Sequence, residues 1–190
     1  MARPVVKKQD IENAAIRLFA TKGLAQTTVK DIASEAGVTE GALYRHYPGK
    51  NAMAWQLFCR EIEKFSIELG KRMFEQGAPL AARVEASVRF IFEYYGRYPV
   101  QFAFILLTQH GFPEEKILDV ASNPIDMVER FVDEAVRAGE IPAMNATLAS
   151  GLVLGLVLQV MVMHRYDRLE IDNAVIDDVV GAAKRILMIG

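Results

Sequence analysis

The segment TVKDIASEAGVTEGALYRHY, residues 28–47, decides the fold, because it reads as a helix, a tight turn and a second, short helix. Thr28 followed three residues later by Asp31 is typical of a capping box, which predicts that the first helix begins directly after Thr28. Ala33 is small enough to lie where two helices cross, and Gly37 can adopt the positive φ that the turn requires. The segment therefore predicts a helix-turn-helix.

The second helix of this segment combines apolar anchors with a polar face. Val38 and Leu43 have the spacing to turn inward, which leaves the other side chains toward solvent. These are Gly41, Ala42, Tyr44, Arg45 and His46. Small residues let a helix enter a groove closely, while tyrosine, arginine and histidine donate hydrogen bonds to phosphates and base edges. The predicted partner of this face is double-stranded DNA. His46 as an ordinary surface histidine is an alternative, and for Tyr47 a core position is the favoured interpretation.

The rest of the chain also reads as helical. Apolar residues at positions 11, 14, 15, 18 and 19 have the spacing of one buried helix face, and Gly23 can end that helix. Asn123, Asn145 and Asp172 are typical N-caps of three later helices. The sequence shows no convincing pair of strands and no internal repeat. We predict an all-α fold of about nine helices with short connections.

Composition and charge indicate a folded protein whose N-terminal part alone is basic. The chain has 190 residues, 52% of them apolar, and a net charge of −2. Residues 1–50 carry eight Lys/Arg and five Asp/Glu, whereas the remainder is acidic, so only the N-terminal part is expected to meet a polyanion. The start, MARPVVKKQD, lacks the apolar stretch of a signal peptide. Cys59 is the only cysteine, which fits a reducing cytoplasm; a redox sensor is the alternative to an ordinary helix residue.

Nothing in the sequence indicates a catalytic site. His46, His110 and His164 are scattered, and no metal-ligand spacing, P-loop, dinucleotide glycine fingerprint or nucleophile elbow is present. We therefore predict a protein that is not an enzyme and that needs neither a metal nor another cofactor. A constitutive DNA-packaging protein is a further alternative, but the acidic body argues against it.

Aromatic residues between positions 55 and 131 favour a pocket for a small apolar or aromatic effector. Ligand pockets are mostly apolar with a few polar groups, and this region offers both kinds of residue. The predicted ligand-binding residues are Trp55, Phe58, Tyr94, Phe102, Gln109, His110, Met127 and Phe131. For each of these aromatic residues taken singly, an ordinary core position is the stronger interpretation.

The run ATLASGLVLGLVLQVMVM, residues 146–163, contains no charged residue over a length that could span a membrane. Thr147, Ser150 and Gln159 interrupt the run, and the chain has no second comparable stretch. A helix that is apolar all round can equally be buried in protein. Both interpretations are open from these residues.

The segment IRLFATKGLAQTTVKDIASEAGVTEGALYRHYPGK, residues 16–50, resembles the N-terminal signature of the TetR family of transcriptional regulators. The positions that carry the resemblance are Phe19, Gly23, Thr27, Thr28, Val29, Ile32, Ala33, Ala36, Gly37, Val38, Gly41, Leu43, Tyr44, His46, Tyr47 and Lys50. The resemblance covers roughly residues 10–55, and the remainder matches the family only in helix count and length.

The resemblance implies that the first three helices bind DNA and that the third enters the major groove. Thr27 and Thr28 would offer hydroxyls and backbone amides to phosphate, and His46 and Lys50 would hold phosphates. The other implied DNA-binding residues are Thr39, Glu40, Gly41, Ala42, Tyr44 and Arg45. Glu40 departs from the commoner neutral or basic residue; it either accepts from a cytosine amino group or, as we favour, stabilises the helix dipole.

The resemblance also implies a homodimeric repressor that an effector releases from a palindromic operator. It divides the chain into a DNA-binding domain at residues 1–50 and a helical ligand-binding and dimerisation domain at residues 51–190. The last two long helices would pair with their copies, which favours a buried dimer helix over a membrane span for residues 146–163. The implied interface residues are Gly151, Leu152, Gly155, Leu158, Gln159, Val175, Val179, Ala183 and Ile186.

Overall fold

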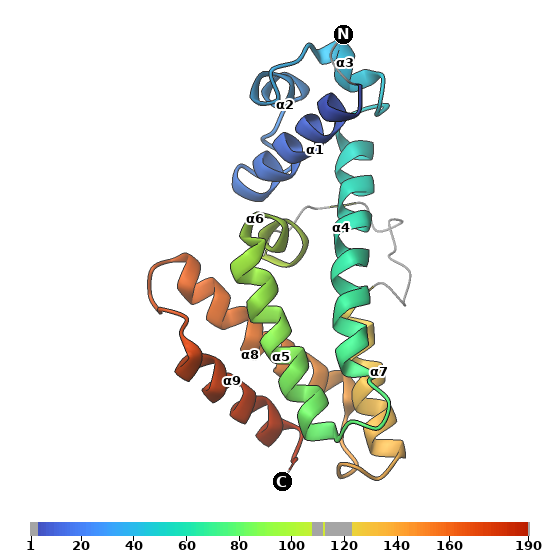
Figure 1. Cartoon of the computed structure of the whole chain (residues 1–190), viewed down its shortest axis with the longest axis vertical. Helices are drawn as coiled ribbons and strands as arrows, with labels where there is room; N and C mark the ends of the chain where they lie inside the picture. The colour runs from blue at the N-terminus through green and yellow to red at the C-terminus, as the bar shows by residue number, and fades with distance from the viewer. Residues whose placement is uncertain (1–3, 108–111, 113–122, 190) are drawn as a thin grey trace. The chain divides into compact units, whose positions relative to one another are not determined.

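The computed structural model describes residues 4–107, 112 and 123–189, and all regular structure in this part of the chain is helical (Figure 1). The elements are α1 (Pro4–Thr21), α2 (Val29–Glu35), α3 (Glu40–Tyr44), α4 (Lys50–Met73), α5 (Leu80–Arg97), α6 (Pro99–Phe102), the π-helical η1 (Ala103–Leu107), α7 (Pro124–Arg137), α8 (Ala146–Arg165) and α9 (Asn173–Ile186). The predicted all-α fold with an N-terminal helix-turn-helix is confirmed.

The described residues fall into two compact units. Unit 1 lies within Met1–Glu61 and Tyr98–Ile117, and unit 2 lies within Ile62–Arg97 and Leu118–Gly190. The division therefore falls inside α4 and at the junction of α5 with α6. The domain boundary predicted at residue 50 stays a prediction.

Unit 1 is built around an apolar core to which the first three helices, the start of α4, and α6 with η1 all contribute. Ile11, Ile32, Leu43 and Leu57 are buried and come from four different helices. Phe19 of α1 stacks on Phe104 of η1, with ring centroids 6.0 Å apart. α1 thus packs against both α2 and the α6–η1 segment, and this packing supports the helix-turn-helix from behind.

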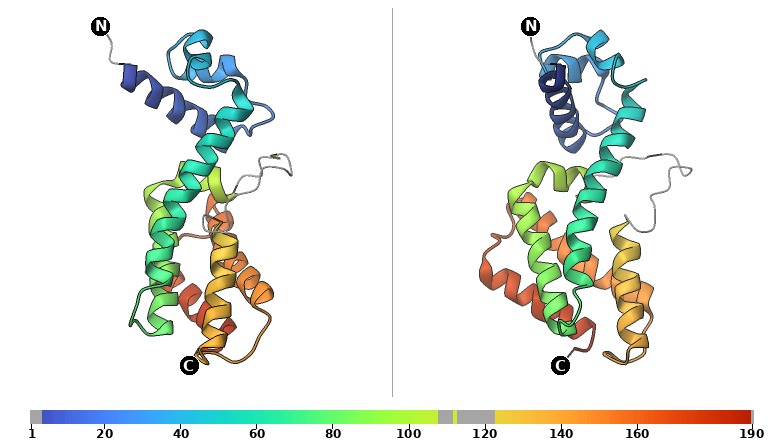
Figure 2. Two further views of the ribbon diagram at one scale, coloured as in Figure 1. Left: turned by 90° about the vertical axis from the view of Figure 1, so that its right-hand side faces the viewer. Right: turned by 45° about the vertical axis from the view of Figure 1, so that its right-hand side comes forward.

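Unit 2 is a helical layer in which α5 lies beside α9 and α7 lies beside α8, with α8 also against α9 (Figure 2). Its core side chains include Phe65, Val88, Phe131, Val157 and Met161. The ammonium of Lys184 on α9 lies 2.9 Å from the carboxylate of Glu85 on α5, so an ion pair joins two helices whose apolar faces are already packed.

The predicted start signals of four helices are confirmed by their hydrogen bonds. The side chains of Asn123, Asn145 and Asp172 each accept a backbone N–H two or three residues later, at 2.9 to 3.1 Å. Thr28 forms the predicted capping box with Asp31. Thr39 differs, because it occupies the N-cap position of α3 but its hydroxyl makes no cap hydrogen bond.

Candidate DNA-binding surface and effector pocket

Backbone geometry fixes the turn between α2 and α3. Gly37 has a φ of +63°, a left-handed conformation in which the Cβ of any other residue crowds the backbone. Glycine is therefore favoured at this position. The N–H of Val38 donates to the carbonyl of Ala33 at 2.9 Å, which closes the end of α2. Ile32 and Leu43 are fully buried and hold the two helices on the core of unit 1.

The capping box at the start of α2 carries a strong local charge interaction. The carboxylate of Asp31 accepts from the ammonium of Lys22 at 2.7 Å and from the backbone N–H of Thr28 at 2.9 Å. In return, the hydroxyl of Thr28 accepts from the N–H of Asp31 at 3.1 Å. Chiefly because of Lys22, and then of Thr28, the pKa of Asp31 falls to about 2.

This lowered pKa predicts how the stability of the unit depends on pH. Ionised Asp31 stabilises the fold above its ordinary pKa of 3.8, and the contribution is lost as the pH falls toward about 2. We expect the wild type to unfold at a higher temperature than Asp31→Asn at neutral pH, and this difference to shrink as the pH falls from about 4 to 3. Thermal unfolding by circular dichroism measures it. A difference that stays constant over this interval would contradict the assigned ion pair.

Most of the predicted DNA-binding residues lie together on the outer face of α3 and at its ends. Tyr44 is 54% exposed. Thr39, Glu40, Gly41, Arg45 and His46 are exposed as well, and Ala42 is half-buried. A methyl group in place of the Gly41 hydrogen would meet no atom closer than 4.0 Å, so a flat surface can approach the backbone here. The face presents a phenol, a guanidinium and an imidazole, all of which can donate hydrogen bonds.

Thr27 requires a correction. Its side chain is fully buried, and its hydroxyl donates to the carbonyl of Gly23 at 2.7 Å. The expectation that this hydroxyl reaches a phosphate is therefore wrong, because it is already used to close the loop after α1. The hydroxyl of Thr28 is exposed and, while it accepts from Asp31, keeps its own hydrogen for a further acceptor.

Lys50 at the start of α4 has a role within the protein that the sequence did not reveal. Its ammonium donates to the carbonyl of Leu24 at 2.7 Å and so ties α4 to the loop between α1 and α2. An ammonium has three donors, so two of them are not used by this hydrogen bond and can meet a phosphate oxygen. The predicted phosphate contact of Lys50 stays a prediction.

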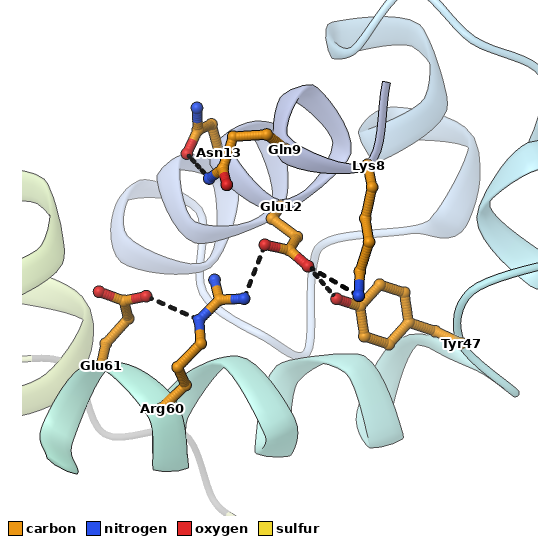
Figure 3. Close-up of polar contacts among 7 residues, drawn as sticks. All are labelled: Lys8, Gln9, Glu12, Asn13, Tyr47, Arg60 and Glu61. Atoms are coloured by element: carbon orange, nitrogen blue, oxygen red, sulfur yellow. Dashed lines mark hydrogen bonds and ion pairs between the residues drawn. The ribbon is translucent and has the colours of Figure 1, made fainter. Parts of the chain in front are cut away.

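A polar network centred on a buried carboxylate joins α1, α4 and Tyr47, which follows α3 (Figure 3). Glu12 of α1 is only 2% exposed. One of its carboxylate oxygens accepts from the hydroxyl of Tyr47 at 2.5 Å, and the other accepts from the guanidinium of Arg60 on α4 at 2.7 Å. Arg60 also donates to Glu61 at 3.0 Å, and the ammonium of Lys8 lies 3.8 Å from Glu12. The core position favoured for Tyr47 is confirmed.

Electrostatics keeps this network charged. Burial of Glu12 opposes ionisation, but the hydrogen bonds from Tyr47 and Arg60 outweigh it, so the pKa of Glu12 lies below its ordinary value. Burial, together with the adjacent carboxylate, raises the pKa of the Tyr47 phenol. Sequence reasoning missed Glu12, Arg60 and Glu61. The available signal was Glu12 itself, a charged residue next to the apolar positions of α1.

The structure divides the predicted ligand-binding residues between the two units. Trp55 and Phe58 belong to an aromatic cluster of unit 1, in which both rings pack on Phe112 with centroids 5.1 and 5.3 Å away. Phe102 is also in unit 1, whereas Tyr94, Met127 and Phe131 are in unit 2. Gln109 and His110 lie outside the described residues.

Unit 2 contains an apolar cavity of about 40 Å³. Its walls include Leu69, Val84, Val88, Val157 and Leu187. Of the predicted ligand residues that the structure describes, only Phe131 lines this cavity. The one polar wall residue is Ser87, whose hydroxyl donates to the carbonyl of Arg83 at 2.7 Å. Such a cavity suits an aliphatic or aromatic group and offers no partner to a charge.

The outer face of α8 is apolar and open in the single chain. Leu148, Leu152, Gly155 and Gln159 recur at spacings of four and three, so they share one helix face, and all four are exposed. Among the described helices, α8 is the one long and apolar enough to cross a membrane, and 28% of its most apolar window is buried. Composition alone thus leaves the membrane alternative open.

The predicted interface residues of α9 need a partial correction. Val179 and Ala183 are buried by α9's own neighbours in unit 2, so their side chains belong to the core of a single chain. Val175 and Ile186 are half-buried and remain available to a partner, as do Gly151, Leu152, Gly155, Leu158 and Gln159 on α8. The misplacement arose because the apolar positions of α9 serve two faces of the helix.

Comparison with known proteins adds an independent line of evidence. The family described as "Bacterial regulatory proteins, tetR family" matches residues 11–57, which contain the helix-turn-helix. The chain is 35% identical over 112 residues to the uncharacterized HTH-type transcriptional regulator YerO of Bacillus subtilis (strain 168); the match spans 58% of this chain but only 38% of that relative. It is 23% identical over 183 residues to the fatty acid metabolism regulator protein of the same organism, across 90% of this chain and 92% of the relative.

A solved structure shares the whole fold. The crystal structure of AibR in complex with isovaleryl coenzyme A and operator DNA has a TM-score of 0.77 with this chain at 23% identity, over 93% of this chain and 97% of that one. The match to the family model therefore falls on the helix-turn-helix, and the fold match extends over both units. The resemblance of the N-terminal part of the chain to the TetR family of bacterial regulatory proteins is thus confirmed over residues 11–57.

Proposed function

We propose that this protein is a cytoplasmic, homodimeric transcriptional repressor that binds a palindromic DNA operator and is released by a small effector. The observation that carries the proposal is the exposed face of α3, with Tyr44, Arg45 and His46 directly beyond a buried helix-turn-helix core. A five-residue recognition helix can read only a few bases, so two copies related by a twofold axis are needed for a specific site. The proposal contains no catalytic step.

The open face of α8 supports the homodimer. Leu152 is 50% exposed beside Gly151 and Gly155, and small residues allow two helices to approach closely. Pairing of this face with its copy would remove apolar surface from water, which stabilises association by roughly 25 cal/mol per Å². A membrane span is the competing use of the same face, and a protein that stays in solution without detergent would argue against it.

The cavity of unit 2 supports an effector with an apolar group, and we propose an acyl-coenzyme A. The fatty acid metabolism regulator and AibR, with its isovaleryl coenzyme A, motivate this class of ligand. At about 40 Å³ the cavity is much smaller than the roughly 150 Å³ that holds benzene in an apolar protein interior. An acyl group must therefore enlarge it, and a ligand that binds only an expanded unit 2 biases the protein toward that shape.

The test of the proposed function is a DNA-binding measurement. Purified protein is titrated onto fluorescent DNA from upstream of its own gene, with a shuffled duplex as control, and then with acyl-coenzyme A thioesters of increasing chain length. We expect preference for the native duplex and a roughly 5- to 150-fold loss of affinity with the matching thioester. Equal affinity for the upstream duplex, the shuffled duplex and duplexes selected from random DNA would refute sequence-specific DNA binding. No response to any thioester would refute the effector class alone.

Filling the cavity should separate effector binding from DNA binding. Val157 of α8 lines the cavity and is buried, so Val157→Phe places a ring where the acyl group would lie. We expect effector affinity to fall at least about tenfold and operator affinity to stay within about twofold, at a cost of about 1–3 kcal/mol in stability. Calorimetric titration and anisotropy measure the two affinities. Val100→Phe, the same change on a half-buried residue of unit 1, is the control. Unchanged effector affinity in Val157→Phe would place the effector elsewhere.

A further inference from the structure

The carboxylate of Glu12 joins three parts of unit 1. Glu12 lies on α1, its Oε1 accepts from Tyr47 just after α3, and its Oε2 accepts from Arg60 on α4. The side chain is almost completely buried, and a buried carboxylate that loses a partner is strongly unfavourable. The three elements are therefore held where both donors reach the two oxygens at the same time (Figure 3).

Tyr47 connects this carboxylate to the recognition helix through the backbone. The N–H of Tyr47 donates to the carbonyl of Leu43 within α3 at 3.0 Å, and the N–H of His46 donates to the same carbonyl at 2.9 Å. The position of Tyr47 thus fixes the C-terminal end of α3. The other end has no side-chain cap, because the hydroxyl of Thr39 makes no such hydrogen bond.

A short helix anchored in this way depends on few contacts. α3 has five residues, of which only Leu43 is fully buried, so one side chain and the turn from α2 hold the helix on the core. The Tyr47 hydroxyl, 2.5 Å from Glu12, supplies the second fixed point. Two fixed points define the direction in which Tyr44 and Arg45 leave the surface.

We propose that Glu12 is a positioning residue for DNA recognition: held by Arg60, it sets the orientation of α3 through the hydroxyl of Tyr47. The network then determines how strongly the protein prefers its operator over other DNA, while general attraction to phosphates is left to other residues. This inference rests on the proposed function, since it concerns the accuracy of the same DNA-binding surface.

The test measures how much more tightly each variant binds the selected operator than a shuffled duplex. A network that only stabilises the fold would not alter this preference. Wild-type protein first selects its best site from random duplex DNA. The dissociation constants for that duplex and for a shuffled duplex are then measured at one salt concentration for wild type, Tyr47→Phe and Glu12→Gln. Tyr47→Phe removes only the hydroxyl and keeps the ring, and Glu12→Gln keeps an acceptor but removes the charge. Thermal unfolding of each variant gives its stability.

We expect the preference for the operator to fall about tenfold or more in Tyr47→Phe and Glu12→Gln, which is the effect of losing one base contact. The affinity of both variants for shuffled DNA should stay within about twofold of wild type. Leu57→Ala, which removes buried apolar side chain from the same unit and no polar group of the network, is the control for lost stability and should keep the preference. Arg60→Lys, which retains one cation but not the fork, should fall between wild type and Glu12→Gln.

Variants that are less stable yet keep the wild-type preference would overturn the inference and leave the network a purely structural one. The same holds if Leu57→Ala loses as much preference as Tyr47→Phe at equal stability. Should Tyr47→Phe not fold, the comparison of Glu12→Gln with Arg60→Lys decides. A wild type that selects no site from random DNA overturns the proposed function, and the inference with it.

Discussion

Replacing Leu152 by glutamate should make the protein monomeric and reduce its operator affinity by about a hundredfold or more. Leu152 is half exposed on the outer face of α8, between Gly151 and Gly155. In a twofold interface the substitution introduces two carboxylates, one from each copy, into the same apolar contact. Desolvating an unpaired charge costs several kcal/mol, which exceeds what an apolar helix pair can supply at this position. Without the dimer, each protomer binds one half-site on its own, and the gain in affinity from linking the two binding events is lost.

Light scattering with chromatography measures the mass, and anisotropy measures operator binding. Ile125→Glu is the matched control, because Ile125 is 58% exposed on α7 and outside the predicted interface. It should remain dimeric with unchanged affinity. If Leu152→Glu stays dimeric at low micromolar concentration, the α8 face is not the interface. If the wild type itself is monomeric and needs detergent to stay in solution, the membrane alternative for α8 becomes the better one.

Tyr44→Ala should weaken binding to the operator by about ten- to a hundredfold and change binding to shuffled DNA by less than about twofold. Tyr44 is 54% exposed on α3, so its removal takes nothing from the core and should leave the unfolding temperature within a few degrees of wild type. A contact to a base edge is typically worth about 1–3 kcal/mol, and its loss falls on the specific site alone.

Lys50→Ala is the contrasting variant for this measurement. If Lys50 meets a phosphate, its loss weakens binding to every duplex and lowers the salt dependence by about one counterion per subunit. Because Lys50 also donates to the carbonyl of Leu24, thermal unfolding must be measured alongside. If Tyr44→Ala weakens binding to operator and shuffled DNA equally, Tyr44 contacts the DNA backbone and reads no base.

Local signals allowed much of the fold to be predicted. The capping box of Thr28 and Asp31 and the side-chain caps at Asn123, Asn145 and Asp172 act within three residues, so the sequence alone contains both partners of each interaction. Gly37 is similar, because a positive φ is a property of one residue. The helix-turn-helix was predictable for the same reason: each of its elements is defined by near neighbours.

The interactions between distant residues were not predictable. Glu12 and Arg60 are 48 residues apart, and neither residue type nor spacing indicates that they meet. The family resemblance implied that Thr27 meets a phosphate, yet its hydroxyl donates within the loop after α1. Counting aromatic residues also failed to locate the cavity: Trp55 and Phe58 stack on each other in unit 1, whereas the cavity walls of unit 2 are mainly aliphatic.

In and just after α3, the residues that hold the helix are separate from those that we propose read DNA. Leu43 and Tyr47 are buried and belong to the core, whereas Tyr44, Arg45 and His46 are exposed. Substitutions at the three exposed positions should therefore be nearly neutral for folding. After a gene duplication, one copy could acquire a new operator by a few such changes while its core and the cavity of unit 2 stayed intact. On the proposed function, the DNA preference could then diverge quickly while unit 2 stayed unchanged.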